Sequence, residues 1–174
     1  MAFNPTFKVK LLEVLDSAYE SDALKNRLRE FVTDTEFKQL FGFRIVDKIV
    51  ERTESGVDKK DNPFPAYSES YKQSLIFKIY KGGQTEVDLR LTGEMLESIT
   101  PKMGRFEIIV GIDGQSNRDK AQGHITGRYG KKGRSRPRDF LGLPSDVLAE
   151  EFRQAMRDYR SNSLQELEAL PDAA

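Results

Sequence analysis

The feature that most constrains this fold is a run of apolar residues at helical spacing between residues 36 and 54. Spacing of three and four residues predicts an α-helix with one buried face. Thr33 and Glu36 have the spacing of a capping box, in which each side chain satisfies a backbone amide at the start of a helix. Gly56 is well placed to end the helix in the left-handed conformation. The apolar residues of the stripe are Phe37, Leu40, Phe41, Ile45 and Ile49.

This predicted helix carries more apolar residues than one face can hold. Phe43, Val46 and Val50 lie off the main stripe. At 1.5 Å per residue the helix spans roughly 28 Å, about the diameter of a small domain. We therefore expect it to be central to the domain or pressed against a second surface.

The other elements are shorter, and their patterns are weaker. Residues 7–14 fit a strand or a helix equally well, and residues 23–31 are predicted to form a short helix that Asp22 caps. Alternation of apolar and polar residues predicts a half-buried strand over residues 87–91, and the Ile- and Val-rich residues 106–112 give the clearest strand of the chain.

Two more helices are predicted beyond these elements. Thr92 is placed to cap a short helix over residues 93–99. Pro144 and Ser145 open a final amphipathic helix that extends to Tyr159. One further helical turn is expected over residues 165–170.

Two segments are predicted to be long loops. Residues 56–71 hold turn-forming Asp, Asn and Pro residues. Residues 114–138 are polar and rich in glycine. Long segments without regular structure are uncommon in compact domains and are often functional. Aromatic residues in the first loop should fold it back onto the body of the protein, and we expect them to make loop contacts. They are Phe64, Tyr67 and Tyr71.

The element order predicts an α+β fold, with a small antiparallel sheet, helices packed on one face and two long loops. The 174 residues fit a single domain. We expect a core over residues 34–160, preceded by an N-terminal segment of open role at 1–33. Residues 161–174 are predicted to be a flexible or docking tail.

Composition excludes several classes of protein. The chain has 28 basic and 28 acidic residues, so a globally basic nucleic-acid binder is not expected. It has no cysteine, which excludes disulfide scaffolds, thiolate metal sites and cysteine catalysis. No apolar run approaches the ~18 residues of a membrane span, and the first ten residues lack the apolar stretch of a signal peptide. We expect a protein made inside the cell, without membrane association.

No catalytic or cofactor motif stands out. His124 is the single histidine, and no motif supplies the nucleophile and orienting partner that a general base needs. Glu54, Asp58 and Asp61 do not meet the twelve-residue pattern of a calcium loop. The glycines of residues 127–133 lack the flanks of a phosphate-binding loop. We therefore predict a protein that is not an enzyme, with no metal and no cofactor.

The strongest electrostatic feature is a basic cluster within residues 128–138 that contains no acidic residue. Such a cluster is a solvated loop, a contact for nucleic-acid phosphates or a docking segment for an acidic protein surface. Our prediction is protein docking, with packaged DNA as a second possible counter-charge. The cluster comprises Arg128, Lys131, Lys132, Arg134, Arg136 and Arg138.

An apolar hinge follows the basic cluster. Phe140 and Leu141 lie between it and the start of the last helix, with bends expected at Gly142 and Pro144. These two apolar side chains either anchor the last helix in its own core or reach into a neighbouring molecule. Both are therefore candidate assembly contacts.

Three stretches of the chain together resemble the phage virion morphogenesis family (Mu-like), which includes tail-completion, minor tail and neck proteins. The order and spacing of the stretches match that family over about residues 36–159. The family usually has Pro where this chain has Asp139, and residues 127–138 are more basic here than is typical. The stretches are Arg52-Thr53-x-x-Gly56-x-Asp58 with Pro63-Phe64-x-x-Tyr67-Ser68-x-x-Tyr71; Leu89-x-Leu91-Thr92-Gly93-x-Met95-Leu96-x-Ser98-Ile99 with the strand after it; and Ala121-x-x-His124-x-x-Gly127 with Arg138-x-Phe140-Leu141-Gly142-Leu143.

The resemblance implies a non-catalytic subunit of the head–tail connector (neck) or of the tail-completion ring of a tailed phage. Such a subunit forms a homo-oligomeric ring, joins head and tail, and contacts other neck and tail proteins such as the connector and the tail terminator. About six copies are expected from tail symmetry, although the sequence does not give the number. The protein would lie in the virion, at the neck or upper tail, and in the host cytoplasm during assembly.

A second hypothesis remains open on the basic cluster alone. The chain would then be a small nucleic-acid-binding module that uses residues 128–138. Its binding would weaken steeply with salt and with neutralisation of the cluster.

Overall fold

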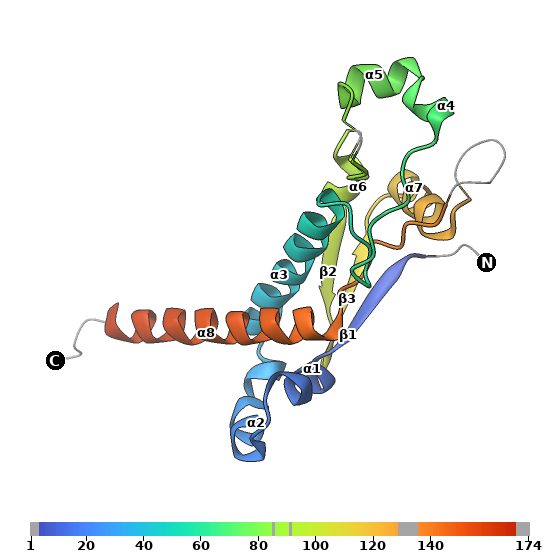
Figure 1. Cartoon of the computed structure of the whole chain (residues 1–174). Coiled ribbons are helices and arrows are strands. Elements are labelled where there is room, and N and C mark those ends of the chain that lie inside the picture. The colour runs from blue at the N-terminus through green and yellow to red at the C-terminus, as the bar shows by residue number, and fades with distance from the viewer. Residues whose placement is uncertain (1–3, 85, 91, 129–135, 170–174) are drawn as a thin grey trace. The chain divides into compact units, whose positions relative to one another are not determined.

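The computed structural model describes residues 4–84, 86–90, 92–128 and 136–169, with side chains through residue 161. This part of the chain forms eight α-helices, one short 3-10 helix and three strands (Figure 1). In chain order they are β1 (Thr6–Lys10), α1 (Leu11–Ala18), α2 (Asp22–Leu28), η1 (Phe31–Thr33), α3 (Thr35–Glu54), α4 (Glu69–Lys72), α5 (Leu75–Lys81), α6 (Glu94–Glu97), β2 (Ile99–Met103), β3 (Glu107–Ile112), α7 (Gln115–Thr126) and α8 (Ser145–Ala169).

The strands form one antiparallel sheet in the order β1-β3-β2, which confirms the predicted α+β fold. The central strand is β3, and its burial alternates along the chain. Ile108, Val110 and Ile112 point into the core with at most 3% of their surface exposed. The strand predicted over residues 106–112 is therefore confirmed.

The chain divides into two compact units. Each of the three strands and α3 supplies residues to both units. The expectation of one domain over residues 1–174 stays a prediction. Unit 1 comprises Met1–Phe7, Val46–Thr100 and Val110–Pro144, and unit 2 comprises Lys8–Ile45, Pro101–Ile109 and Ser145–Ala174.

The helix that the apolar spacing predicted is α3, which spans 20 residues. Its start is built differently from the predicted capping box. The Asp34 carboxylate accepts a hydrogen bond from the Phe37 amide at 3.0 Å, while the Thr33 hydroxyl donates to the Glu30 carbonyl. Asp34 is the better cap because its charge also favours the positive end of the helix dipole. Gly56 has a φ of +81°, which fits its predicted role just beyond the helix.

Aromatic rings fill the core of unit 2. Phe37 and Phe41 on α3 stack with their centroids 6.1 Å apart. Phe152 on α8 meets them edge-to-face at 5.3 and 5.2 Å, a geometry that aromatic pairs favour. All three side chains are fully buried. The predicted apolar faces of α3 and α8 therefore pack against each other.

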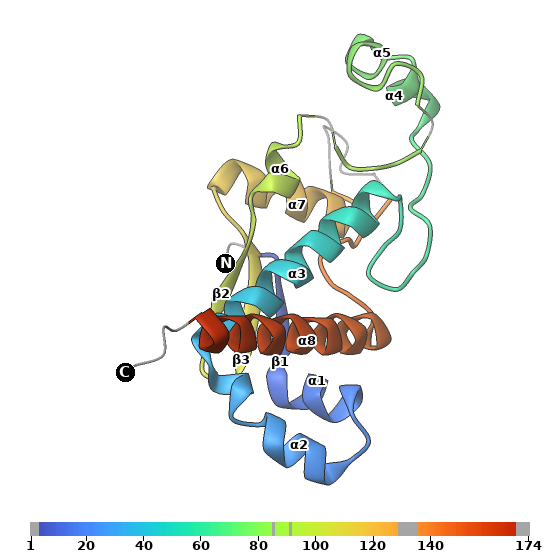
Figure 2. The same cartoon turned by 90° about the vertical axis from the view of Figure 1, so that its left-hand side faces the viewer.

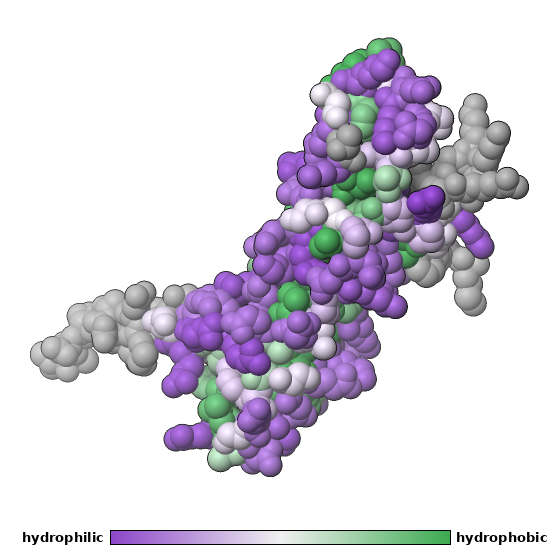
Figure 3. Space-filling model, viewed as in Figure 1, coloured by the Kyte–Doolittle hydropathy of each residue, from purple (hydrophilic) through white to green (hydrophobic). Residues whose placement is uncertain are grey.

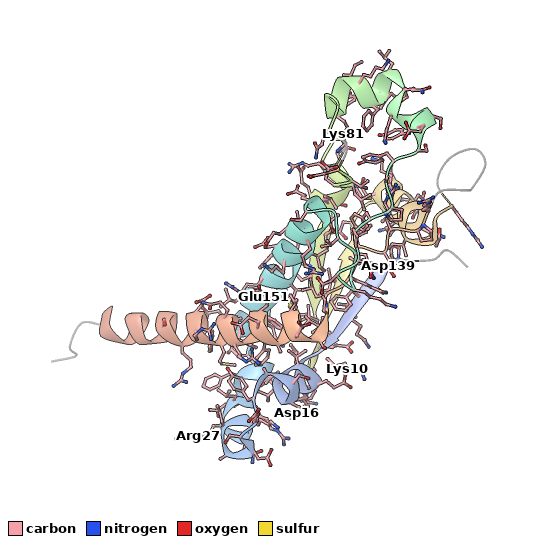
Figure 4. The ribbon with its side chains drawn as sticks, in the orientation of Figure 1. Lys10, Asp16, Arg27, Lys81, Asp139 and Glu151 are labelled. Atoms are coloured by element: carbon pink, nitrogen blue, oxygen red, sulfur yellow. The ribbon has the colours of Figure 1, made fainter. Side chains whose placement is uncertain are left out.

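An ion-pair network at the surface joins the same two helices. Arg44 on α3 pairs with Glu151 at 3.0 Å and with Asp158 at 3.0 Å, and both acids lie on α8. Figure 4 shows Glu151 on the side of α8 that faces α3. Because Arg44 is about one-third exposed, the network contributes little beyond the aromatic packing.

Gly42 allows α3 to approach the sheet closely in unit 2. A Cβ atom at this position would lie 2.8 Å from Cε of Met103 and 3.1 Å from Cβ of Pro101, both on β2. Glycine inside a helix usually lowers stability. Here the missing side chain makes room for the strand.

At the N-terminus, the two alternatives for residues 7–14 are both realised in succession. β1 ends at Lys10 and α1 begins at Leu11 without a connecting loop. The predicted helix at 23–31 is α2, and its cap is Ser21 rather than Asp22. The Ser21 side chain accepts from the Leu24 amide at 3.4 Å.

The predicted strand over residues 87–91 is wrong. The alternating burial is present, since Val87 and Leu89 are buried. However, Leu89 has a φ of +51°, outside the strand region. The Asp88 carboxylate accepts from the Arg90 amide at 3.0 Å, a local turn that competes with extended backbone. Leu91 lies outside the described residues.

The short helix predicted at 93–99 is α6, which spans only four residues. Gly93, with a φ of +87°, takes the cap position predicted for Thr92, and Ile99 already begins β2. Pro144 and Ser145 open α8 as predicted, and the helix continues through residue 169 without the interruption expected near residue 160.

The two predicted loops have different outcomes. Residues 56–68 are irregular, as predicted, and α4 begins at Glu69. The prediction of a loop over 114–138 is wrong for residues 115–126, which form α7. Residues 127–128 and 136–138 have no regular structure, as predicted, and residues 129–135 lie outside the described residues. Only Ala121 and Gly123 are buried on α7. Such small residues leave almost no apolar periodicity for sequence analysis to detect.

Candidate interaction surface

A short helical hairpin in unit 1, formed by α4 and α5, is built on three aromatic rings. Tyr67, Tyr71 and Phe77 pack with their centroids 5.2 to 5.5 Å apart. Phe77 is only 4% exposed. Figure 2 shows the two helices side by side, as Figure 1 does. The cluster fixes the inner face of α5.

Hydrogen bonds fix both ends of α5. Ser74 caps its start by accepting from the Phe77 amide at 3.2 Å, and Gly82 ends it in the left-handed conformation. At the end of the helix, the buried Lys81 ammonium donates to the Asp88 carboxylate and to the Arg90 carbonyl. Figure 4 labels Lys81 at this point. The hairpin is therefore held to the segment that follows it.

The outer face of α5 is apolar and exposed. Figure 3 shows hydrophobic residues gathered over this helix. Exposed apolar groups of this kind mark interaction surfaces more often than isolated ones do. We call these four residues the α5 face: Leu75 (72% exposed), Ile76 (53%), Ile79 (66%) and Tyr80 (57%).

Sequence analysis missed this face because it predicted no helix at residues 75–81. The signal is present in the sequence: a serine before a short apolar run and two glycines after it. With apolar residues at five of its seven positions, however, the run has no polar side from which exposure can be inferred.

Arg138, predicted to be an interaction residue, is buried within unit 1. Its guanidinium donates to the Pro65 carbonyl at 2.9 and 3.2 Å and to the Ala66 carbonyl at 3.4 Å. It also lies 5.4 Å from the centre of the Tyr67 ring. Burial lowers its pKa, while the nearby Tyr67 and Tyr71 hydroxyls act in the opposite direction. Arg138 thus holds the first loop in place through Pro65 and Ala66, and it contacts Tyr67 of the aromatic cluster against which α5 packs.

The other predicted contacts of this region also lie inside the protein. Phe140 and Leu141 are buried, which fits anchoring in the chain's own core and not a reach into a neighbour. Phe64 is buried as well. Tyr67 and Tyr71 make the loop contacts described above, which agrees with a loop that folds back onto the body. Phe64, Phe140 and Leu141 thus contribute their side chains to the chain's own core.

The rest of the basic cluster is only partly described. Arg128, its first residue, and Arg136, two residues before its last, are exposed. Lys131, Lys132 and Arg134 lie outside the described residues. The described part therefore offers two arginines to a partner, and the third arginine, Arg138, is committed internally.

Stretches that carry the family resemblance meet in unit 1. Lys59 of the first stretch pairs with Asp139 at 2.7 Å, and its amide donates to the Asp139 carbonyl at 2.9 Å. Figure 4 labels Asp139 in this loop region. Arg90 of the second stretch pairs with Glu54 at 2.5 Å. Residues that are distant in the sequence thus hold one framework together.

The acidic residues of the first loop serve the loop itself. Asp58 accepts from the Lys60 and Asn62 amides at 2.7 and 2.9 Å. Burial acts to raise its pKa, but these hydrogen bonds outweigh burial and lower the pKa. Asp61 pairs with Arg52. Within the described ranges, no three His, Asp or Glu side chains gather as a metal site would require.

His124 lies on α7 and is largely buried. Its carbonyl accepts from the Arg138 amide at 2.8 Å. Burial first, and the positive charge of Arg138 second, lower its pKa to about 4. The neutral imidazole is therefore the form that the fold accommodates.

Asp88 is the centre of the most concentrated group of ionisable side chains near the hairpin. Besides Lys81, it accepts from the Tyr67 hydroxyl at 3.4 Å. Burial, and then the charge of Asp88, raise the pKa of Tyr67. This arrangement can hold the end of α5 in place.

No helix of the described residues is long and apolar enough to cross a membrane. Comparisons of this chain with family models, curated proteins and solved structures gave no match.

Proposed function

We propose that this protein is a structural subunit of the head–tail connector (neck) or of the tail-completion ring of a tailed phage. It would assemble into a homo-oligomeric ring and join head and tail, with other neck and tail proteins as partners. The proposal assigns it no catalysis and no cofactor. Its place would be the virion, with assembly in the host cytoplasm.

The α5 face is the observation that carries this proposal. Four neighbouring apolar side chains are exposed, yet the helix beneath them is fixed by an aromatic cluster around the buried Phe77 and by Lys81. A rigid apolar surface of this kind suits a protein that reaches its final state only in an assembly. The resemblance of the three stretches supplies the kind of assembly.

The test is to locate the chain in purified phage particles by cryo-electron microscopy or by labelling a tagged copy. A ring of density between the portal and the tail is the expected result, and it would give the copy number. Absence from purified particles would overturn the proposal, provided that the tagged chain is present in the lysate from which they came.

Nucleic-acid binding through residues 128–138 is the second candidate, and the exposure of Arg128 and Arg136 is what favours it. Fluorescence anisotropy with a labelled duplex would test it. Binding should weaken steeply with salt and collapse when Lys131, Lys132, Arg134 and Arg136 are neutralised together. Weak binding with no salt dependence would remove this candidate.

A further inference from the structure

We propose that the α5 face of one copy docks into an open hollow in unit 2 of a second copy. This inference deepens the proposed function, because ring assembly requires a contact between two different surfaces of the same chain. It rests on two surfaces that are each described within one unit.

The hollow is shallow, has a volume of about 480 Å3 and lies between the start of α1 and the turn that joins β2 to β3. Two large apolar side chains in it, Leu12 and Phe106, are 38% and 40% exposed. The Leu11 amide donates to the Phe106 carbonyl at 3.0 Å, which holds the two walls together. The lining residues are Lys10, Leu12, Glu13, Arg105, Phe106 and Glu107.

The charged groups around the hollow are engaged with one another. Lys10 pairs with Glu13 at 2.6 Å, and Glu107 pairs with Lys8 at 2.6 Å. The Arg105 guanidinium lies 5.1 Å from the centre of the Phe106 ring. Three of the four charged lining residues are thus in ion pairs, and Arg105 lies against the Phe106 ring. Leu12 and Phe106 form the apolar floor, which suits an apolar partner better than a charged ligand.

The size of the α5 face fits a protein interface. The largest apolar patch on a typical monomer has an area of about 300–600 Å2. The four side chains of the α5 face are each exposed by half or more, so their summed exposed area is about that size. A stable interface takes about 800 Å2 from each partner. The α5 face therefore supplies about half of one side, as the apolar centre of the contact.

Charge favours this hollow over a second α5 face. Lys78 is the exposed charged residue within α5 itself. In a symmetric contact between two α5 faces, the two Lys78 side chains would approach each other. Asp16 is exposed on α1, one helical turn beyond Leu12, and Figure 4 labels it on this helix. Its carboxylate complements Lys78.

A contact between two different surfaces leaves one of each unoccupied in a dimer. Further copies can therefore add until the ring closes. The same arrangement explains why one chain carries two different exposed apolar surfaces, the α5 face and the hollow: each would bind the other surface on a neighbouring copy.

Site-specific disulfide formation gives a direct test, since the protein has no cysteine of its own. Ile79→Cys and Leu12→Cys are made as separate full-length variants, mixed and oxidised. The expected product is a dimer that contains one chain of each. Phe43→Cys, at another exposed apolar position, replaces Leu12→Cys in the control mixture and should give no such dimer with Ile79→Cys.

Three results would overturn the inference. Dimers of Ile79→Cys with itself would show an α5–α5 contact. An internal disulfide in a chain with both cysteines, without the mixed dimer, would show that the hollow receives its own α5. Failure to form any mixed dimer at the highest soluble concentration would show that the two surfaces do not meet.

Analytical ultracentrifugation provides a second readout. Leu75→Ser combined with Ile79→Ser should weaken self-association by about tenfold or more, the effect of losing central apolar contacts. Asp16→Lys should weaken it less, and adding Lys78→Asp should restore part of the loss. If the serine variant associates as strongly as the parent, the inference is overturned.

The two proposals fail separately. A chain found in the neck of the particle without the Ile79–Leu12 cross-link would keep the proposed function and remove the docking contact. A clear cross-link in a protein absent from particles would do the reverse.

Discussion

The Arg138 guanidinium lies 5.4 Å from the centre of the Tyr67 ring while it donates to the Pro65 carbonyl at 2.9 and 3.2 Å. One side chain therefore fastens the first loop and supports the aromatic cluster under α5. The orientation of the α5 face is fixed because Phe77, on the opposite side of α5, packs against Tyr67 of this cluster.

Replacing Arg138 with methionine should lower the free energy of unfolding by about 2 kcal/mol. The substitution keeps the apolar stem but removes charged hydrogen bonds, which contribute about 1.5–3 kcal/mol, and the contact with the ring. Urea unfolding measures the change. Arg136→Met removes an equal charge from an exposed position and should change stability by less than about 0.5 kcal/mol. If both variants lost the same free energy of unfolding, the loss of a positive charge, and not the loss of the Pro65 contact, would be its cause.

Phe77→Ala should destabilise unit 1 by about 3 kcal/mol, since it opens a cavity in the aromatic cluster. Ile79→Ala, two residues along the same helix, should change stability by less than about 0.5 kcal/mol because Ile79 is 66% exposed. Denaturant midpoints of the two variants test the orientation of α5. A large loss for Ile79→Ala in the monomer would contradict an exposed outer face.

Phe152→Ala should lower the free energy of unfolding by about 3–5 kcal/mol, the usual range for a fully buried phenylalanine. Its ring meets those of Phe37 and Phe41 edge-to-face in unit 2. Phe43→Ala on α3 removes an equally large ring from the surface and serves as the control. Near-ultraviolet circular dichroism and thermal unfolding would follow both variants. A small effect at Phe152 would show that the cluster collapses around the gap.

Acid should destabilise the protein through His124. Its pKa is about 4 in the folded protein and 6.5 in the absence of the fold. Because the folded pKa is the lower one, the unfolded chain binds the proton more readily. The contribution of the neutral His124 imidazole to the free energy of unfolding is therefore fully present above pH 6.5 and is lost as the pH falls toward 4. The loss is about 3 kcal/mol, since one pKa unit corresponds to about 1.4 kcal/mol.

The measurement is the urea midpoint at several pH values between 7 and 4, for the parent and for His124→Gln. Glutamine does not titrate, so the variant should lose less stability over this range. Parallel curves for the two proteins would show that other groups cause the acid sensitivity.

The sequence by itself determined the elements whose residues repeat over several turns or pleats. α3 and α8 each present an apolar face long enough to specify a helix, and β3 alternates between core and surface. The turn-forming residues of 56–68 likewise exclude regular structure wherever they lie. In each case a single segment contains all the information needed.

Only the tertiary structure decided which side chains face outward and which charges are buried. Arg138 belongs to a basic cluster in the sequence, yet its hydrogen-bond acceptors are more than 70 residues away. From the sequence alone, Phe77 and Ile79 are equally apolar and equally able to be buried. Phe77 is buried because Tyr67 and Tyr71 cover its side of α5. Periodicity is a local property, whereas the cost of burying a charge or exposing an apolar face depends on residues that only the fold brings near.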